Sequence, residues 1–159
     1  MPAVPPQAQP EGSLLVSLAG IALLVIGILV GLAGMGMMAL GLIARAAFET
    51  ALQNADPSRF TVDVVRVAEG VIVVLGVLFL VYGLGELIAG VGVLLKRQWG
   101  RLLGLVLSII AGLLTTLVLL GSLSADNARG GLVLFLVFTI AYWFIVYALA
   151  TGGRAFRRG

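Results

Sequence analysis

The sequence predicts an all-α integral membrane protein, a four-helix bundle with up-down topology. Of its 159 residues, 61% are apolar and only 11% are charged, whereas soluble proteins average about 45–50% apolar and about 25% charged residues. A soluble domain of this length cannot bury so much apolar surface, so the chain belongs in a lipid bilayer. Cys and His are both absent, which excludes disulfides, thiolate metal sites and His-dependent catalysis. We therefore expect no metal and no cofactor.

The first apolar run covers residues 13–44 and contains no charge. A helix of this length measures about 48 Å, against about 30 Å for the hydrocarbon core, so it must tilt or extend beyond the bilayer. Residues 1–12 hold four of the five prolines and are predicted to form a disordered tail. The tail lacks the basic region of a signal peptide, so we expect the first span to remain uncleaved.

Three further apolar runs predict the remaining spans. Residues 70–95 contain a single charge, Glu86; residues 99–124 carry only Arg101 near their start, and residues 130–151 carry no charge. Each run is long enough to cross the hydrocarbon core as a helix. Residues 13–151 are therefore predicted to form a single four-helix transmembrane domain.

The connection at residues 45–69 is predicted to be an external loop. Its first part indicates a helix that leaves the membrane. Its last part, residues 60–67, contains enough β-branched residues for a short strand. We favour a helix that leads into the second span, because Val62, Val65 and Glu69 lie on helical spacing. The other two connections are very short, which predicts a tight up-down sequence of the last three helices.

The distribution of basic residues predicts the orientation. Four spans place both termini and the second connection on one side, which carries Lys96, Arg97, Arg101, Arg154, Arg157 and Arg158. The opposite side carries four basic residues that lie among acidic ones, namely Arg45, Arg59, Arg66 and Arg129. We therefore expect both termini, including a basic tail at residues 152–159, to be cytoplasmic, in the cytoplasmic (inner) membrane of a bacterium.

The basic cluster beside the second and third spans is interpreted as a lipid-interface site. It consists of Lys96, Arg97, Trp99 and Arg101. Trp is typical of the headgroup level, and Arg can reach lipid phosphates. The cluster is too small, and too close to the spans, for nucleic acid to be a partner. The lipid bilayer is the predicted partner.

The glycines follow regular spacings that predict close helix packing. They recur every seven residues in the first and second spans and every four in the third. The predicted packing positions are Gly20, Gly27, Gly31, Gly34, Gly76, Gly83, Gly90, Gly100, Gly104 and Gly112. Packing within the chain is the favoured use of these seams, and self-association into a homo-oligomer is the alternative. The fourth span is instead rich in aromatic residues, which we expect to fill space against glycine grooves.

Glu86 is the candidate functional residue. It lies ten residues before Lys96, about 15 Å along the helix and near mid-membrane, where an ionisable residue is a functional candidate by default. Desolvation without a counter-charge disfavours the ionised form, so we expect a protonated carboxyl group. Tyr82 is expected on its helix face, Ser108 and Tyr142 at a similar depth, and Thr139 a turn deeper on the Tyr142 face. Two interpretations remain: a structural hydrogen bond to Ser108 or Tyr142, which we favour, or exchange of a proton or cation.

The segment Gly90–Gly104 begins with a glycine-rich helix end. A tight loop follows, which contains basic residues, then Trp99, a small residue and Arg101, and the next helix continues as Leu-x-Gly. This segment resembles uncharacterised small four-span membrane proteins of bacteria, and the likeness covers the second and third spans. The resemblance implies the four-span architecture. It implies no chemistry, because those families have no assigned activity.

The functional prediction is a non-enzymatic accessory or interaction subunit, part of a homo-oligomer or a larger membrane complex. The spans contain no paired acid and base, no phosphate-binding loop and no Ser-Lys constellation. The alternative is a small oligomeric transporter or channel that uses Glu86 as a proton or cation site. A lipid-modifying enzyme is disfavoured because catalytic residues are lacking.

Overall fold

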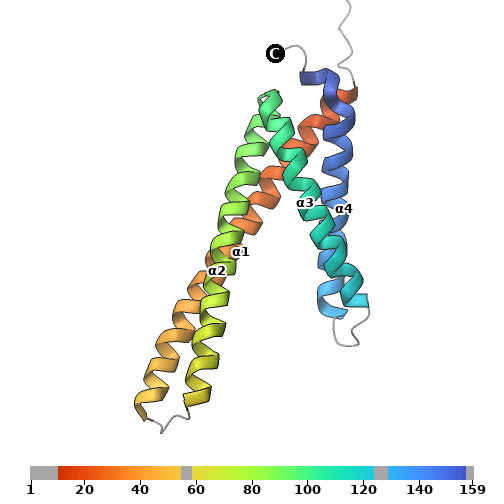
Figure 1. Cartoon of the computed structure of the whole chain (residues 1–159). Coiled ribbons are helices and arrows are strands. Elements are labelled where there is room, and N and C mark those ends of the chain that lie inside the picture. Colours follow the sequence, from red (N-terminus) through yellow and green to blue (C-terminus); the bar gives the residue numbers. More distant parts are fainter. Residues whose placement is uncertain (1–10, 55–58, 124–128, 157–159) are drawn as a thin grey trace, which may run out of the picture. The chain divides into compact units, whose positions relative to one another are not determined.

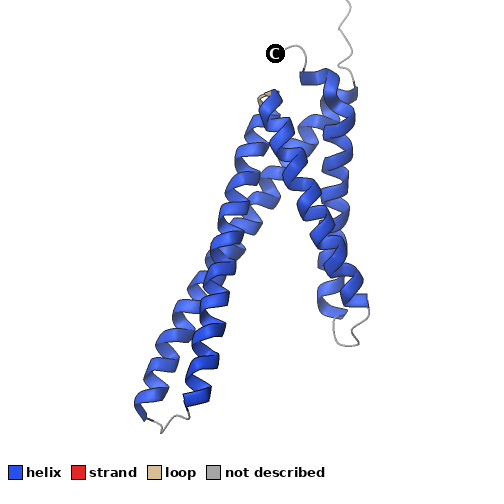
Figure 2. Ribbon diagram, in the orientation of Figure 1, coloured by secondary structure: helices blue, strands red, loops and turns tan. Residues whose placement is uncertain are grey.

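The computed structural model describes residues 11–54, 59–123 and 129–156. Its helices follow one another in the order α1 (Glu11–Asn54), α2 (Arg59–Leu94), α3 (Gln98–Leu123), α4 (Arg129–Thr151) and the short 3-10 helix η1 (Gly152–Phe156) (Figure 1). Figure 2 shows that the described residues are helical throughout, apart from the tight turn between α2 and α3. The predicted fold class is confirmed: all-α, with four long apolar helices that pack sequentially, consistent with a four-span up-down bundle.

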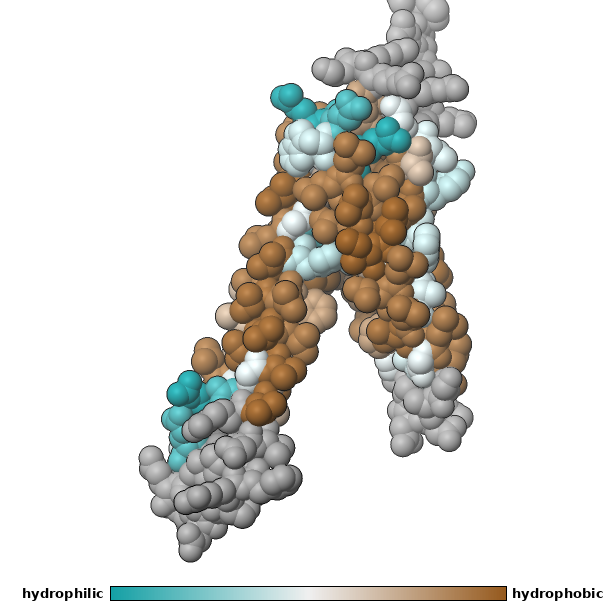
Figure 3. Space-filling view, in the orientation of Figure 1, coloured by the Kyte–Doolittle hydropathy of each residue, from teal (hydrophilic) through white to brown (hydrophobic). Residues whose placement is uncertain are grey.

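Each α-helix contains a stretch that is long and apolar enough to cross a membrane. These stretches are Leu14–Ala47, Val67–Leu94, Gln98–Leu123 and Gly131–Thr151. Large aliphatic side chains lie exposed along all four helices, and the space-filling view is predominantly brown over the helices (Figure 3). Because a bilayer solvates such surface and water does not, the chain is an integral membrane protein with four spans.

Helices α1 and α2 continue well beyond the predicted spans. α1 begins at Glu11 and ends at Asn54, and α2 begins at Arg59, so most of the predicted loop at 45–69 is helical and residues 60–67 form no strand. No proline interrupts the chain between Pro10 and Pro57, and proline is the strongest helix breaker. Residues 1–10 of the predicted tail lie outside the described residues.

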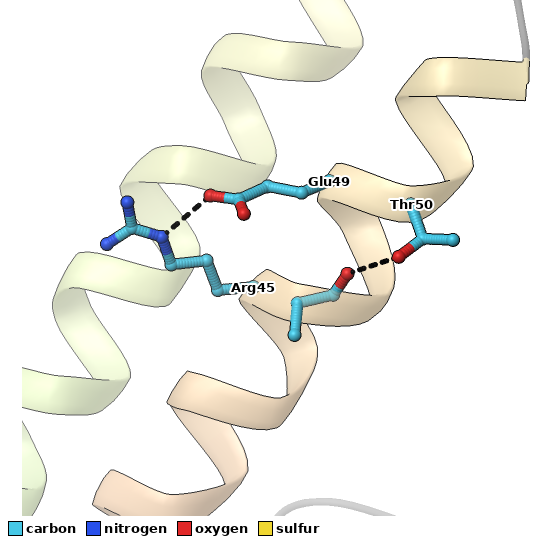
Figure 4. A network of polar contacts seen from close by, with 4 residues as sticks. Arg45, Glu49 and Thr50 are labelled. Atoms are coloured by element: carbon cyan, nitrogen blue, oxygen red, sulfur yellow. Dashed lines mark hydrogen bonds and ion pairs between the residues drawn. The ribbon is translucent and has the colours of Figure 1, made fainter.

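A local polar network accompanies the extension of α1 (Figure 4). Arg45 Nε donates to Glu49 Oε1 at 2.9 Å, and Thr50 Oγ1 donates to the Ala46 carbonyl oxygen at 2.9 Å. Both contacts join residues four apart, which is the spacing of neighbours on a helix surface. The charged end of α1 therefore stays helical where the apolar run stops.

The described residues fall into two compact units. Unit 2 is Ile26–Gly85 and contains the later part of α1 and the earlier part of α2. In it the two backbones meet directly: a Cβ atom on Gly34 would lie 2.6 Å from the Leu80 amide nitrogen and 2.7 Å from the Gly76 carbonyl oxygen. Only glycine allows two helices to approach so closely.

Unit 1 comprises Met1–Val25 and Glu86–Gly159. Gly104 of α3 is surrounded by residues from the start of α1, from the end of α2 and from α4. A Cβ atom on that residue would meet Leu23 Cδ1 at 3.0 Å, Leu149 Cδ1 at 3.2 Å and Ala89 Cβ at 3.7 Å. Side-chain tips, rather than backbone, thus fill the centre of unit 1.

The turn between α2 and α3 reverses the chain within three residues. The Arg97 amide donates to the Gly92 carbonyl oxygen at 2.9 Å, and the Lys96 amide donates to that of Val93 at 3.0 Å. These two bonds form a Schellman motif, in which the residue after the helix end adopts the left-handed conformation. Lys96 has a φ of 54°, where glycine is the usual residue. The tight turn makes α2 and α3 antiparallel neighbours.

The aromatic helix α4 packs against glycine, as predicted. A Cβ atom on Gly112 would lie 3.5 Å from Trp143 Cε2 and 3.6 Å from Tyr142 Cβ. Trp143 Nε1 also donates to Thr116 Oγ1 at 3.2 Å. The small residue on α3 therefore leaves room for a large aromatic side chain on α4.

Candidate functional site

Glu86 lies on the buried face of α2. Its relative exposure is 0%, and Ala89, Gly90 and Val93, which follow at helical spacing, are buried as well. The same periodicity that directs the apolar residues inward therefore directs the carboxyl side chain inward. Unit 1 contains Glu86, whereas Tyr82, which is half-buried, belongs to unit 2.

Ser108 lies on the buried face of α3. This face consists of Gly100, Gly104, Ser108, Ala111 and Gly112. The hydroxyl oxygen of Ser108 is fully enclosed and makes no hydrogen bond to any residue that the structure describes.

The contacts between α2 and α3 follow a regular step from the turn towards Glu86 and Ser108. Gly92 touches Gly100 next to the turn, and Ala89 meets the Cβ position of Gly104 at 3.7 Å one step further along. Each step advances three residues on α2 and four on α3, in opposite chain directions. One more step of this pattern would lead to Glu86 and Ser108, and both residues are 0% exposed.

Tyr142 and Thr139 lie on α4, and a contact with α3 gives the position of Tyr142. Leu149 packs at Gly104, whereas Tyr142 packs at Gly112, two turns further along α3 and one turn beyond Ser108. The Tyr142 ring stacks on Phe138 with centroids 6.4 Å apart, and Thr139 Oγ1 donates to the Phe135 carbonyl oxygen at 2.8 Å.

The chain continues after α4 as η1, in which Gly152 and Phe156 are buried. Ser108 and Tyr142 both remain predicted partners of Glu86.

Arg101 has a role that the sequence argument missed. Its Nε donates to the Leu149 carbonyl oxygen at 2.8 Å and its Nη2 to that of Ala150 at 3.2 Å. The guanidinium carbon also lies 5.7 Å from the centroid of the Phe156 ring. A cation at the C-terminal carbonyls of a helix is favourable. The sequence contains one indication of this contact, because Phe156 is an apolar residue within the basic tail.

The other lipid-interface residues stay at the surface. Lys96 and Arg97 are exposed, and Trp99 is 50% exposed. The inner edge of the Trp99 ring contacts Gly92: Cη2 lies 2.9 Å from the position that a Cβ would take there. The ring is thus held against α2 while its outer part faces the surroundings, as an interfacial Trp does.

The predicted packing glycines lie mostly at close contacts within the two units. In unit 1, a Cβ on Gly20 would meet Leu94 at 2.8 Å and one on Gly90 would meet Leu24 at 2.9 Å. In unit 2, one on Gly83 would lie 2.6 Å from the Gly31 amide nitrogen and 2.7 Å from the Gly27 carbonyl oxygen, whereas the Cβ direction of Gly31 itself is open.

Three further glycines lie at close contacts: Gly41, which faces Val73, Gly92, and Gly153, which faces Arg101. Gly41 belongs to the seven-residue series of the first span. Gly92 lies outside that series.

Comparison with protein-family models, with curated proteins and with solved structures found no match to this chain. The resemblance to small bacterial four-span proteins is therefore supported only at the level of four membrane-crossing helices.

Proposed function

We propose that this four-span membrane protein is a non-enzymatic accessory or interaction subunit of a bacterial inner membrane. The carrying observation is the complete burial of Glu86. It is enclosed in unit 1 together with residues that pack tightly around Gly104. A carboxyl group in such a position can hold helices in register, but it cannot meet a substrate without opening the unit.

The outer surface supports the same proposal. The exposed described side chains of the spans are mostly Leu, Ile, Val and aromatic residues, which offer packing area and no reactive group. A membrane subunit that acts by association needs only such a surface, with local gaps that let another helix approach. Gly36 is one such gap, because nothing lies within 4 Å of the position of an added Cβ.

The proposed orientation has both termini in the cytoplasm, because six basic residues lie on that side. Reporter fusions at Gln98 and at the C-terminus should give cytoplasmic signals, and fusions at Asp56 should give external ones. An external signal at Gln98 would overturn this orientation.

The competing function is transport through a proton or cation site at Glu86. Reconstituted vesicles separate the two functions: flux is measured across a pH gradient and across a cation gradient for the parent and for Glu86→Gln. Gln keeps the shape, one donor and one acceptor but cannot ionise. Absence of flux in both proteins is the expected result. Flux in the parent that Glu86→Gln abolishes would reject the accessory function.

Association is tested by the size of the protein extracted from its native membrane in a mild detergent. We expect a particle larger than the 16.5 kDa chain with its detergent, either a homo-oligomer or a larger complex. Gly36→Leu should shrink this particle while leaving the helix content intact, because the new side chain projects into open space. A particle of monomer size for the parent would contradict the proposal.

A further inference from the structure

The turn between α2 and α3 lies at the boundary of two membrane-crossing stretches. One stretch ends at Leu94 and the next begins at Gln98, so the three residues between them lie where the hydrocarbon core gives way to lipid headgroups. Leu95 and Leu102, close to this boundary, are 64% and 61% exposed, which suits contact with acyl chains. The turn therefore presents its exposed polar side chains to the headgroup region.

Two basic side chains of the turn face outward. Lys96 and Arg97 are both exposed. The ion pair of Arg45 with Glu49 belongs to unit 2, so no ion pair among the described residues neutralises the turn. Arg101 instead donates to carbonyl oxygens at the end of α4. The structure thus divides the basic cluster into one residue that faces the protein and one pair that faces the surroundings.

The backbone at Lys96 is strained. Its φ of 54° is a left-handed conformation that glycine adopts without steric cost and lysine does not. Strain of this kind is typical of positions where the side chain has a function. Trp99 lies three residues later, half exposed and held against Gly92. The turn therefore combines two outward cations with an aromatic ring fixed at the level where Trp usually meets lipid.

We propose that Lys96 and Arg97, with Trp99 beside them, bind the phosphate group of an anionic phospholipid. Basic side chains form charge-assisted hydrogen bonds to phosphate oxygens, and anionic lipids attract basic residues that lie beside a membrane span. A zwitterionic headgroup carries a cation of its own and offers less attraction. The exposed leucines beside the turn add contacts to the acyl chains, which free phosphate lacks.

This lipid site goes beyond the proposed accessory function, because it assigns a ligand to the α2–α3 turn and does not require another subunit. The experiment measures binding to the purified full-length protein in detergent by native mass spectrometry. The probes are phosphatidylglycerol, which is anionic, phosphatidylcholine, which is zwitterionic, and inorganic phosphate. We expect phosphatidylglycerol to bind more tightly than phosphatidylcholine, and an equal concentration of inorganic phosphate not to displace it.

Lys96→Gly and Arg97→Gln should each reduce the preference for phosphatidylglycerol about fivefold, the factor that one basic residue contributes near an anionic lipid surface. Because glycine suits the left-handed turn, Lys96→Gly removes the side chain without disturbing the fold, which its helix content verifies. Lys96→Arg keeps the charge and should keep the preference. The matched control is Arg45→Gln, which removes one exposed basic residue from unit 2 and should leave the preference unchanged.

Four results would overturn the proposal. Equal binding of the two lipids by the parent would mean that the turn does not select an anionic headgroup. A preference that survives both Lys96→Gly and Arg97→Gln would place the anionic lipid elsewhere on the protein. An equal loss in Arg45→Gln would indicate an effect of net charge alone. Displacement of phosphatidylglycerol by an equal concentration of inorganic phosphate would indicate a site for the free anion.

Discussion

The two units of this protein solve the same packing problem in different ways. In unit 2, α1 and α2 press backbone against backbone, so that a Cβ on Gly34 or Gly83 would lie 2.6 Å from a main-chain nitrogen. In unit 1, the space beside Gly104 is filled by the tips of Leu23 and Leu149. Lipid gives apolar helices little reason to associate. Unit 2 responds with close backbone approach, whereas unit 1 combines a backbone contact between Gly92 and Gly100 beside the turn with side-chain packing around Gly104.

Polar groups follow the same division. The buried polar residues Glu86, Ser108 and Thr139 all belong to unit 1, as do the contacts of Arg101 with the end of α4. Side-chain packing leaves room for polar groups between helices, whereas direct backbone contact leaves none. The difference teaches that glycine spacing alone does not reveal which kind of interface a membrane helix will form.

The largest effect is expected for Gly34→Ala in unit 2. The new Cβ would approach backbone atoms of Leu80 and Gly76, which cannot move without separating the helices. We expect a loss of about 3 kcal/mol of stability, the upper part of the range for overpacking, measured by denaturant titration of the purified protein in detergent. Gly36→Ala is the control and should cause no loss, because its Cβ would enter open space and alanine gains about 1 kcal/mol of helix propensity over glycine. Equal effects would mean that the backbone contact is absent in the membrane.

The next effect concerns Arg101→Met, which keeps an apolar stem but removes both bonds to α4. Hydrogen bonds from charged groups contribute about 1.5–3 kcal/mol each when buried. Because Arg101 is partly exposed, we expect a loss of about 2 kcal/mol in total and faster amide hydrogen exchange at residues 149–156. Arg97→Met removes an exposed charge from the same turn and should leave that exchange unchanged. Unchanged exchange in Arg101→Met would show that η1 is held by other contacts.

Lys96→Gly should stabilise the protein. A left-handed residue with a side chain costs about 1–2 kcal/mol relative to glycine, and Lys96 occupies that conformation at the end of α2. We expect a gain of about 1 kcal/mol by the same denaturant titration. Arg97→Gly, one residue later, should bring no gain. A loss of stability in Lys96→Gly would indicate that its side chain makes a stabilising contact with lipid headgroups.

The smallest effect is expected for Gly104→Ala in unit 1. Its Cβ would meet the ends of two leucine side chains at 3.0 and 3.2 Å, and such ends can rotate away. Alanine also gains about 1 kcal/mol of helix propensity over glycine, so the net change should remain within about 1 kcal/mol. A loss as large as that of Gly34→Ala would remove the distinction between the two units.

Much of the fold was predictable because hydropathy and the bilayer act on the chain directly. The four spans follow from apolar runs of sufficient length. The helical lead into the second span follows from spacing alone, and α2 indeed begins at Arg59. The extension of α1 to Asn54 was only partly predicted, because the end of an apolar run marks the membrane boundary rather than the end of a helix.

The candidate site was predictable in its central residue and less so in its surroundings. A lone carboxyl group in an apolar run identifies Glu86 without any structure. Its neighbours on other helices depend on the register between those helices, which hydropathy does not determine. The role of Arg101 was only weakly indicated by Phe156, because a basic residue beside a span is compatible with lipid phosphate and with helix carbonyls alike.

The sequence by itself determined that this protein crosses a membrane four times with one buried carboxyl group, because hydropathy is a local property that each run carries alone. The tertiary structure decided which glycines touch backbone and which touch side chains, because that depends on the register between helices and on the shapes they present. It also decided that the buried Ser108 hydroxyl makes no hydrogen bond to a described residue, since a rotamer responds to neighbours that lie far away in the chain. Register and rotamers arise only when the helices meet.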